Sequence, residues 1–155
     1  MKNNYLHQFD YELWANELTI NAIKLSNEPD ERVFQLISHI VASHSIWLSR
    51  IKGEKPGIGG WDLMTLDECL DCARNTTKNW SEYLNKANTE EFERQIHFKL
   101  LEKDAKISVK NLIIHLISHS AYHRGQIIAR LKGKLEPLPL TTYIAYAKND
   151  SGNKI

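Results

Sequence analysis

The sequence predicts an all-α domain with four long helices, and three observations support this prediction. Apolar residues recur every three or four positions over four stretches, the spacing that places them on one face of a helix. Glycine or proline, which end helices, lies between most of these stretches. The chain of 155 residues has the length of one domain. The helices are expected at about residues 3–25, 30–52, 65–87 and 109–132.

The first two helices are expected to be antiparallel neighbours. The segment Ser26–Pro29 joins them, and so short a connection permits few other arrangements. The first helix carries at helical spacing the apolar residues Leu6, Phe9, Leu13, Ile20 and Ile23. The second ends at Gly53 and is expected to bury Val33, Leu36, Ile37, Ile40, Trp47, Leu48 and Ile51.

A glycine-rich segment at residues 53–60 follows, and we interpret it as a surface connector. It holds four of the chain's seven glycines, but it lacks the preceding strand and the Gly-Lys-Ser/Thr ending of a phosphate-binding loop. The third helix then begins at a capping box, in which Thr65 and Glu68 each satisfy a free backbone N–H.

Cys69 and Cys72, the only cysteines, form a Cys-x-x-Cys motif on the third helix. A redox pair or half of a zinc site is one interpretation, but there is no second cysteine pair and no preceding strand of the thioredoxin kind. Cys69 lies near the apolar arc of Leu66, Leu70, Ala73, Trp80 and Leu84. We therefore predict that Cys69 is a small buried hydrophobe.

Between residues 94 and 108 the period changes, which predicts a small β-hairpin before the last long helix. Ile96, Phe98 and Leu100 alternate with polar residues, and the turn is expected at Glu102–Ala105. An isolated hairpin is marginally stable, so this one must pack on the helices, as a lid or strap.

The last long helix is expected to begin after Ser108, which can cap it, and to end at Gly133. Pro137 and Pro139 then favour an extended segment. We expect a single domain at residues 1–148 and a flexible tail at residues 149–155.

Composition argues against several classes of partner. Hydrophobic residues make up 42% of the chain and charged residues 25%, with a net charge of +1, so there is no electrostatic reason to expect binding to nucleic acid or to an acidic membrane. No apolar run approaches 18 residues, and Met1–Tyr5 lacks the apolar stretch of a secretion signal. A cytoplasmic location is expected.

Three histidines stand four residues apart on the last long helix, at His115, His119 and His123. A four-residue step turns the side chain by about 40° and rises about 6 Å, so an adjacent pair can hold one metal ion. His115 and His123 are about 12 Å apart along the axis, too far for two bonds of about 2.0–2.1 Å to one ion. His119 and His123 border the apolar arc, whereas His115 lies further out, which favours His119 with His123.

A metal site of this kind needs a third ligand, which the second helix offers as His39 or His44. These two lie about 140° apart in projection, so both cannot serve from a regular helix. His39 borders the apolar arc, which favours it weakly, whereas His44 projects into the core, where a backbone carbonyl is the expected partner.

Two histidine motifs resemble those of the DinB family of bacterial damage-inducible and related proteins. They are Ser38–Ile51, which begins Ser-His-Ile-Val-Ala-Ser-His, and His119–Ile127, which reads His-Ser-Ala-Tyr-His-Arg-Gly-Gln-Ile. Tyr11–Asn16 resembles the family's first-helix pattern, and the resemblance extends over about residues 5–147. It implies a four-helix bundle with a divalent metal ion.

By motif position, the resemblance implies that His39, His119 and His123 are the three ligands, and that His115 is not one. It also implies a homodimer, and some relatives are thiol-dependent S-transferases or hydrolases. Imidazole suits zinc, nickel, copper and iron alike, so the metal is not identified. For the dimer, the first helix offers apolar residues outside its tightest stripe, namely Tyr5, Trp14 and Leu18.

A three-histidine ion keeps positions for water or substrate, and it can activate either water or a thiol. Hydrolysis needs a carboxylate base that the sequence does not place, so we rank thiol transfer to an electrophilic small molecule above hydrolysis. A non-catalytic structural metal module is the other alternative. A fourth protein ligand, such as Cys69 or His44, would indicate it. His44, Tyr122 and Arg124 are candidates to orient ligands or substrate, or to be purely structural.

Overall fold

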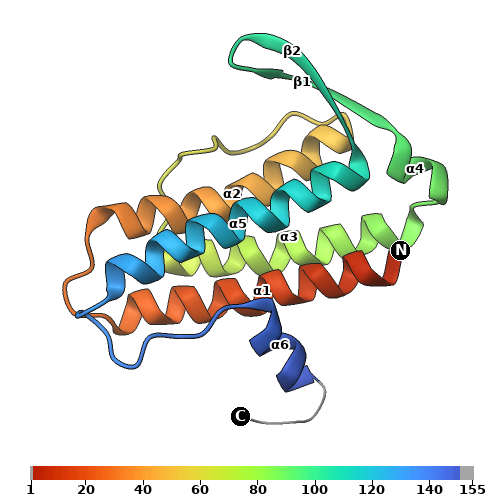
Figure 1. Cartoon of the computed structure of the whole chain (residues 1–155). Coiled ribbons are helices and arrows are strands. Elements are labelled where there is room, and N and C mark those ends of the chain that lie inside the picture. The colour runs from red at the N-terminus through yellow and green to blue at the C-terminus, as the bar shows by residue number, and fades with distance from the viewer. Residues whose placement is uncertain (1, 151–155) are drawn as a thin grey trace.

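The structure is a computed structural model that describes residues 2–150, and four long helices pack in it as a bundle (Figure 1). The long helices are α1 (Lys2–Leu25), α2 (Glu31–Ile51), α3 (Leu66–Lys86) and α5 (Val109–Leu131). The shorter elements are α4 (Thr89–Glu93), β1 (Gln95–Leu100), β2 (Lys103–Ser108) and α6 (Tyr143–Asp150). The predicted helical fold with a hairpin before the last long helix is confirmed.

The helices of the bundle do not neighbour one another in chain order. α1 packs mainly against α3 and α5, and α2 packs against the same two helices. α1 and α2 run in opposite directions, as predicted, but they touch only slightly (Figure 1). The prediction that they are neighbours is therefore wrong, because a short link fixes the direction of two helices but can cross the end of a bundle diagonally. This arrangement leaves α2 beside α5, which carries the other histidine motif.

The core consists of two apolar halves with a buried polar layer between them. The half nearer the hairpin contains Phe9, Leu48, Trp80, Leu116 and their neighbours, and the other half contains Ile20, Ile40, Ala73, Ile127 and theirs. On every long helix, buried polar residues lie in sequence between those two sets; they include Glu12, Asn16, His44, Thr76, Ser120 and Arg124. Side chains from all four helices thus meet in one layer.

Local signals in the sequence set the ends of the helices. At α3, the Thr65 hydroxyl accepts from the backbone N–H of Glu68 at 3.2 Å, and the Glu68 carboxylate accepts from the N–H of Thr65 at 2.7 Å. Ser108 caps α5 by accepting from the N–H of Asn111. Gly133 follows α5 with φ at +78°, a conformation that glycine adopts without strain. The predicted caps are confirmed.

The β-hairpin forms where it was predicted, but its turn is elsewhere. Leu100 pairs with Lys103, so the turn is Leu101–Glu102, and the residues expected to form it belong largely to β2. Phe98 packs edge-on against Trp47, with ring centroids 5.1 Å apart. Figure 1 shows the hairpin projecting from the end of the bundle where α5 begins.

Two short helices were not predicted. α4 follows α3 after a link of two residues, Ala87 and Asn88, and α6 lies across α1 (Figure 1). In α6, Tyr146 packs on Trp14 and Tyr11 at centroid distances of 5.5 and 5.7 Å. Both helices are too short to show a helical period, so apolar spacing could not reveal them. The predicted flexible tail, apart from the last turn of α6, lies outside the described residues.

Within residues 2–150, no helix combines the length and the apolar composition that crossing a membrane requires.

Candidate metal centre

The structure brings together the three histidines that were predicted as ligands. His39 comes from the middle of α2, and His119 and His123 come from successive turns on one face of α5. Each offers a ring nitrogen, and these nitrogens all lie within 4.8 Å of one another. The three side chains are half-buried, so the cluster is open to solvent on one side. The i, i+4 spacing on α5 and the contact of α5 with α2 together produce it.

Hydrogen bonds orient two of the three rings. His39 Nδ1 lies 2.5 Å from the carbonyl oxygen of Gly60, and His123 Nδ1 lies 2.8 Å from the side-chain oxygen of Gln126. Because these oxygens accept, each Nδ1 carries the hydrogen, and in the neutral form of either ring the Nε2 keeps a lone pair. This is how proteins commonly fix a histidine for metal binding.

His39 and His119 face each other in a way that calls for a shared partner. Their Nε2 atoms are 3.0 Å apart, and the other ring nitrogen of His119, Nδ1, is buried without a hydrogen-bond partner. Without an ion, a hydrogen on His119 Nε2 can be donated to His39 Nε2; without that hydrogen, the two nitrogens can share a cation. Two imidazole nitrogens bound to one ion are at most about 4.2 Å apart, so a small closure of the cluster would suit a divalent ion. The residues present fit the metal that the resemblance implies.

Burial disfavours the charged forms of His39 and His119. Burial lowers the pKa of His39, the hydrogen bond to Gly60 opposes this, and the charges of His123 and Arg32 lower it further. Burial, reinforced by the neighbouring histidines, lowers the pKa of His119 to about 3. Neutral imidazole is the form that binds metal, so protons compete little with an ion here near neutral pH.

The end of the glycine-rich segment, with the adjoining Trp61, holds the ring of His39 in place. Gly60 supplies the carbonyl that accepts from this ring, and the indole of Trp61 stacks on it with centroids 3.8 Å apart and planes 5° apart. The guanidinium of Arg32 lies 4.9 Å from the Trp61 ring. The interpretation of this segment as a plain surface connector is therefore wrong at its end. It, rather than the hairpin, reaches the histidines. Sequence reasoning missed Trp61 because a loop has no period that would show where its side chains point.

His115 lies beside the cluster without belonging to it. Its ring centroid is 5.4 Å from that of His119 and 6.5 Å from that of Trp47, and the side chain is exposed. The ring nitrogens that lie close together are those of the His119–His123 pair, which is the pair that the helical projection favoured.

His44 is in the core, as its projection predicted, but its partner was not predicted. Its Nε2 lies 2.8 Å from the hydroxyl of Ser120 and 3.8 Å from the carboxylate of Glu12. The expected bond to a backbone carbonyl is wrong; instead, the carbonyl of His44 itself accepts from Trp80 Nε1 at 3.1 Å. Burial lowers the pKa of His44 to about 3, and the charge of Arg124 contributes. His44 thus faces away from the three ligands.

Arg124 is a buried structural cation rather than an exposed substrate-binding group. Its two terminal nitrogens donate to both oxygens of Glu12, at 2.7 and 2.8 Å, and also to Asn16 and Tyr11. Burial disfavours the charged guanidinium, but the hydrogen bonds and the charge of Glu12 outweigh it and raise the pKa of Arg124. Tyr122, the third candidate, is 66% exposed and lies beside His123 with ring centroids 5.1 Å apart.

The sequence did contain a signal for this buried ion pair. Ser120 and Arg124 continue the row of buried residues that runs along α5 through Leu112 and Leu116 to Ile127. Polar residues at positions whose spacing predicts burial need partners of their own.

The cysteines lie apart from the histidines. Cys69 is fully buried with its sulfur 3.6 Å from the Ser38 hydroxyl, and Cys72 is half-buried. Burial raises the pKa of both thiols, so they stay protonated near neutral pH. The prediction that Cys69 is a buried hydrophobe is confirmed.

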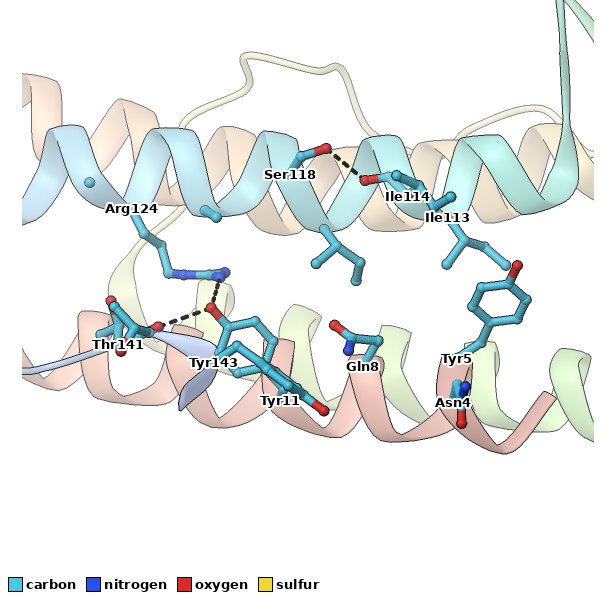
Figure 2. A pocket seen from close by; sticks show the side chains of 14 residues that line it. Asn4, Tyr5, Gln8, Tyr11, Ile113, Ile114, Ser118, Arg124, Thr141 and Tyr143 are labelled. Atoms are coloured by element: carbon cyan, nitrogen blue, oxygen red, sulfur yellow. Dashed lines mark hydrogen bonds between the residues drawn. The ribbon is translucent and has the colours of Figure 1, made fainter. Parts of the chain in front are cut away.

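A large cavity lies on another face of α5, between α1, α5 and the chain before α6 (Figure 2). It has a volume of about 680 Å³ and is mostly apolar. Arg124 and Thr141 lie at one end of it and Tyr5 and Ile113 at the other, and none of the three clustered histidines lines it. Its size alone does not make it the reactive site.

A four-helix bundle with three histidines converging from two helices defines a helical protein with a candidate metal site of the DinB kind. A sequence model of the DinB family matches residues 1–147, and the chain belongs to this family. No curated protein matches the sequence.

Proposed function

We propose that the protein holds one divalent ion with His39, His119 and His123, and that it transfers a thiol to an electrophilic small molecule. The observation that carries this proposal is the convergence of three imidazoles with no fourth protein donor among the described residues. Membership in the DinB family supports it, because some relatives are thiol-dependent S-transferases.

The absence of a further donor within the described part of the chain favours a site that stays open to substrate. Cys69 is buried beside Ser38, His44 is bonded to Ser120, and His115 is outside the cluster. A structural site would usually be closed by a fourth protein ligand, often cysteine. An ion held by three imidazoles keeps its charge of +2 and can lower the pKa of water or of a thiol.

The surroundings favour a thiol over water as the nucleophile. The buried carboxylate of Glu12 is engaged by Arg124 and is not available as a base for hydrolysis. In a thiol transfer, the sulfur forms a bond with an electrophilic carbon, the thiol gives up its proton to solvent, and the leaving group departs with the electrons of the bond that breaks. The protein holds the three histidines in place, disfavours protonation of His39 and His119, and leaves one side of the site open to substrate. Zinc, nickel and iron are all compatible with this set of nitrogens.

The metal part of the proposal is tested by elemental analysis of the purified protein and of three variants. We expect one ion per chain in the wild type, loss of the ion in His119→Ala and in His123→Ala, and retention in His115→Ala, which removes a histidine of the same helix that lies outside the cluster. Unchanged metal content in His119→Ala would refute the ligand set.

The thiol part is tested with cobalt in place of the native ion. Low-molecular-weight thiols should produce a sulfur-to-metal charge-transfer absorption, and an assay of conjugation to electrophiles should then show turnover. An absorption spectrum that no thiol changes would indicate a closed site and favour the structural alternative. Turnover of esters or amides without thiol would favour the hydrolase.

A further inference from the structure

A second cavity lies between α2 and α5, close to the three histidines. Its volume is about 410 Å³, and it is lined by Arg32, Leu36, Gln126, Ala129 and Arg130. Leu36 is three residues before His39, and Gln126 is three residues after His123. Three residues of helix rise about 4.5 Å, so this cavity lies about one helical turn from the histidines along both helices.

Two contacts join this cavity to the histidines. Gln126 is part of its wall, and the side-chain oxygen of this residue holds His123 Nδ1 at 2.8 Å. Arg32 lies over the ring of Trp61, which stacks on His39. A molecule in the cavity would therefore be next to residues that position two of the three proposed ligands.

The cavity presents two guanidinium groups with little to neutralise them. Arg32 donates to the side-chain oxygen of Gln35 at 3.0 Å and makes no ion pair with any described residue. Among the described residues, Arg130 pairs only with Asp30, at 3.3 Å, and this pair is partly exposed. Arginine binds carboxylates and similar oxyanions through two parallel hydrogen bonds, which makes it well suited to recognise such groups.

We propose that this cavity binds an anionic oxygen group of the substrate whose thiol reaches the three histidines. The substrate class is then a thiol that carries a carboxylate or another oxyanion, held by Arg32 and Arg130 while its sulfur lies at the site. This inference rests on the proposed function and adds the chemistry that selects one thiol from another.

The test compares matched thiols on the cobalt-loaded protein by titrating the charge-transfer absorption. The pairs are 6-mercaptohexanoate with 6-mercaptohexan-1-ol, and 3-mercaptopropionate with 3-mercaptopropan-1-ol, so that two lengths bracket the reach of the cavity. A third probe, 3-mercaptopropane-1-sulfonate, distinguishes a tetrahedral oxyanion from a planar carboxylate. We expect at least one anionic thiol to bind about tenfold more tightly than its neutral partner, and this preference to shrink at high salt.

The Arg32→Gln and Arg130→Gln variants assign the preference to the cavity. Each should bring the ratio of the two affinities close to one, while Arg74→Gln should keep it. Arg74 is an exposed arginine that pairs with Glu17 of α1, away from the cavity. Equal binding of anionic and neutral thiols by the wild type, or an undiminished preference in both variants, would overturn this inference alone. A spectrum that no thiol changes would overturn the proposed function and this inference with it.

Discussion

His119 packs against both of the other histidines of the cluster. Its ring centroid is 4.8 Å from that of His39 and 4.6 Å from that of His123, and its pKa is lowered to about 3 by burial and by its neighbours. A ring in this position can bind an ion without first losing a proton at neutral pH. Both candidate pairs in the sequence contained His119.

His44 makes the metal-free protein sensitive to acid. In the native state the pKa of His44 is about 3, whereas an unfolded histidine titrates near its ordinary value of about 6.5. Between these values the unfolded chain binds a proton that the native state excludes, so the free energy of unfolding falls as the pH falls. This one residue contributes up to about 1.4 kcal/mol for each pH unit.

Urea denaturation of the metal-free protein from pH 7 to pH 4 measures this effect. We expect the loss of stability to be smaller in His44→Gln, which keeps a hydrogen-bonding group beside Ser120 but does not titrate. His97→Gln changes an exposed histidine on β1 and serves as the control. Equal slopes for the wild type and His44→Gln would contradict this assignment.

At the scale of the element, the loop at residues 53–61 determines how firmly the ring of His39 is held. Because Trp61 stacks on that ring, Trp61→Ala should weaken metal affinity by about tenfold, the lower end of the effect of residues that orient metal ligands. Trp61→Phe should recover most of it, since a phenyl ring can also stack. Leu63→Ala, at an exposed position two residues after Trp61, is the control. Competition with a chelator gives the metal affinities. Similar affinities for Trp61→Ala and Leu63→Ala would show that the stack of Trp61 on His39 does not contribute to metal binding.

The Glu12–Arg124 pair joins α1 to α5 within the polar layer. Removing one partner leaves the other charge buried and unpaired, so Glu12→Gln and Arg124→Met should each lower the free energy of unfolding by about 3–5 kcal/mol. The double variant should cost less than the sum of the two. Breaking the exposed Glu17–Arg74 pair with Arg74→Gln should cost less than about 1 kcal/mol. Chemical denaturation measures all four, and additive losses in the double variant would contradict this coupling.

The periodicity of the sequence predicted the elements better than it predicted their partners. The long helices and the place of His44 in the core follow from apolar spacing, because burial of a helix face requires it, and the caps follow from the residue types at the helix ends. The choice of His39 needed the resemblance of a motif. The stack of Trp61, the α6 helix and the partner of Arg124 were not predicted, because they depend on which residues the fold brings together from distant parts of the chain.

At the scale of the whole molecule, a homodimer stays a prediction, and the structure alters its grounds. Trp14, one of the residues that suggested an interface, packs against Tyr146 of α6 in the same chain. The cavity in Figure 2 offers other apolar surface, since two residues that line it are exposed, Ile114 to 58% and Tyr143 to 40%. An apolar surface of this kind often marks an interface.

Light scattering at micromolar concentration tests the dimer. We expect a mass of twice the chain mass of 17.9 kDa for the wild type and a single chain mass for Ile114→Asp, which puts a charge into this cavity. Lys78→Asp, at an exposed position of α3, should leave the mass of the assembly unchanged. A wild-type mass of 17.9 kDa would rule the dimer out under these conditions.

The proposal that three histidines hold an ion with an open position is tested most directly by X-ray absorption spectroscopy of the metal-loaded protein. It predicts three imidazole nitrogens at about 2.0–2.1 Å from a zinc ion and no sulfur. Addition of a thiol should then bring in one sulfur at about 2.3 Å. A sulfur or a fourth imidazole present before any thiol is added would contradict it, because the site would already be closed by the protein.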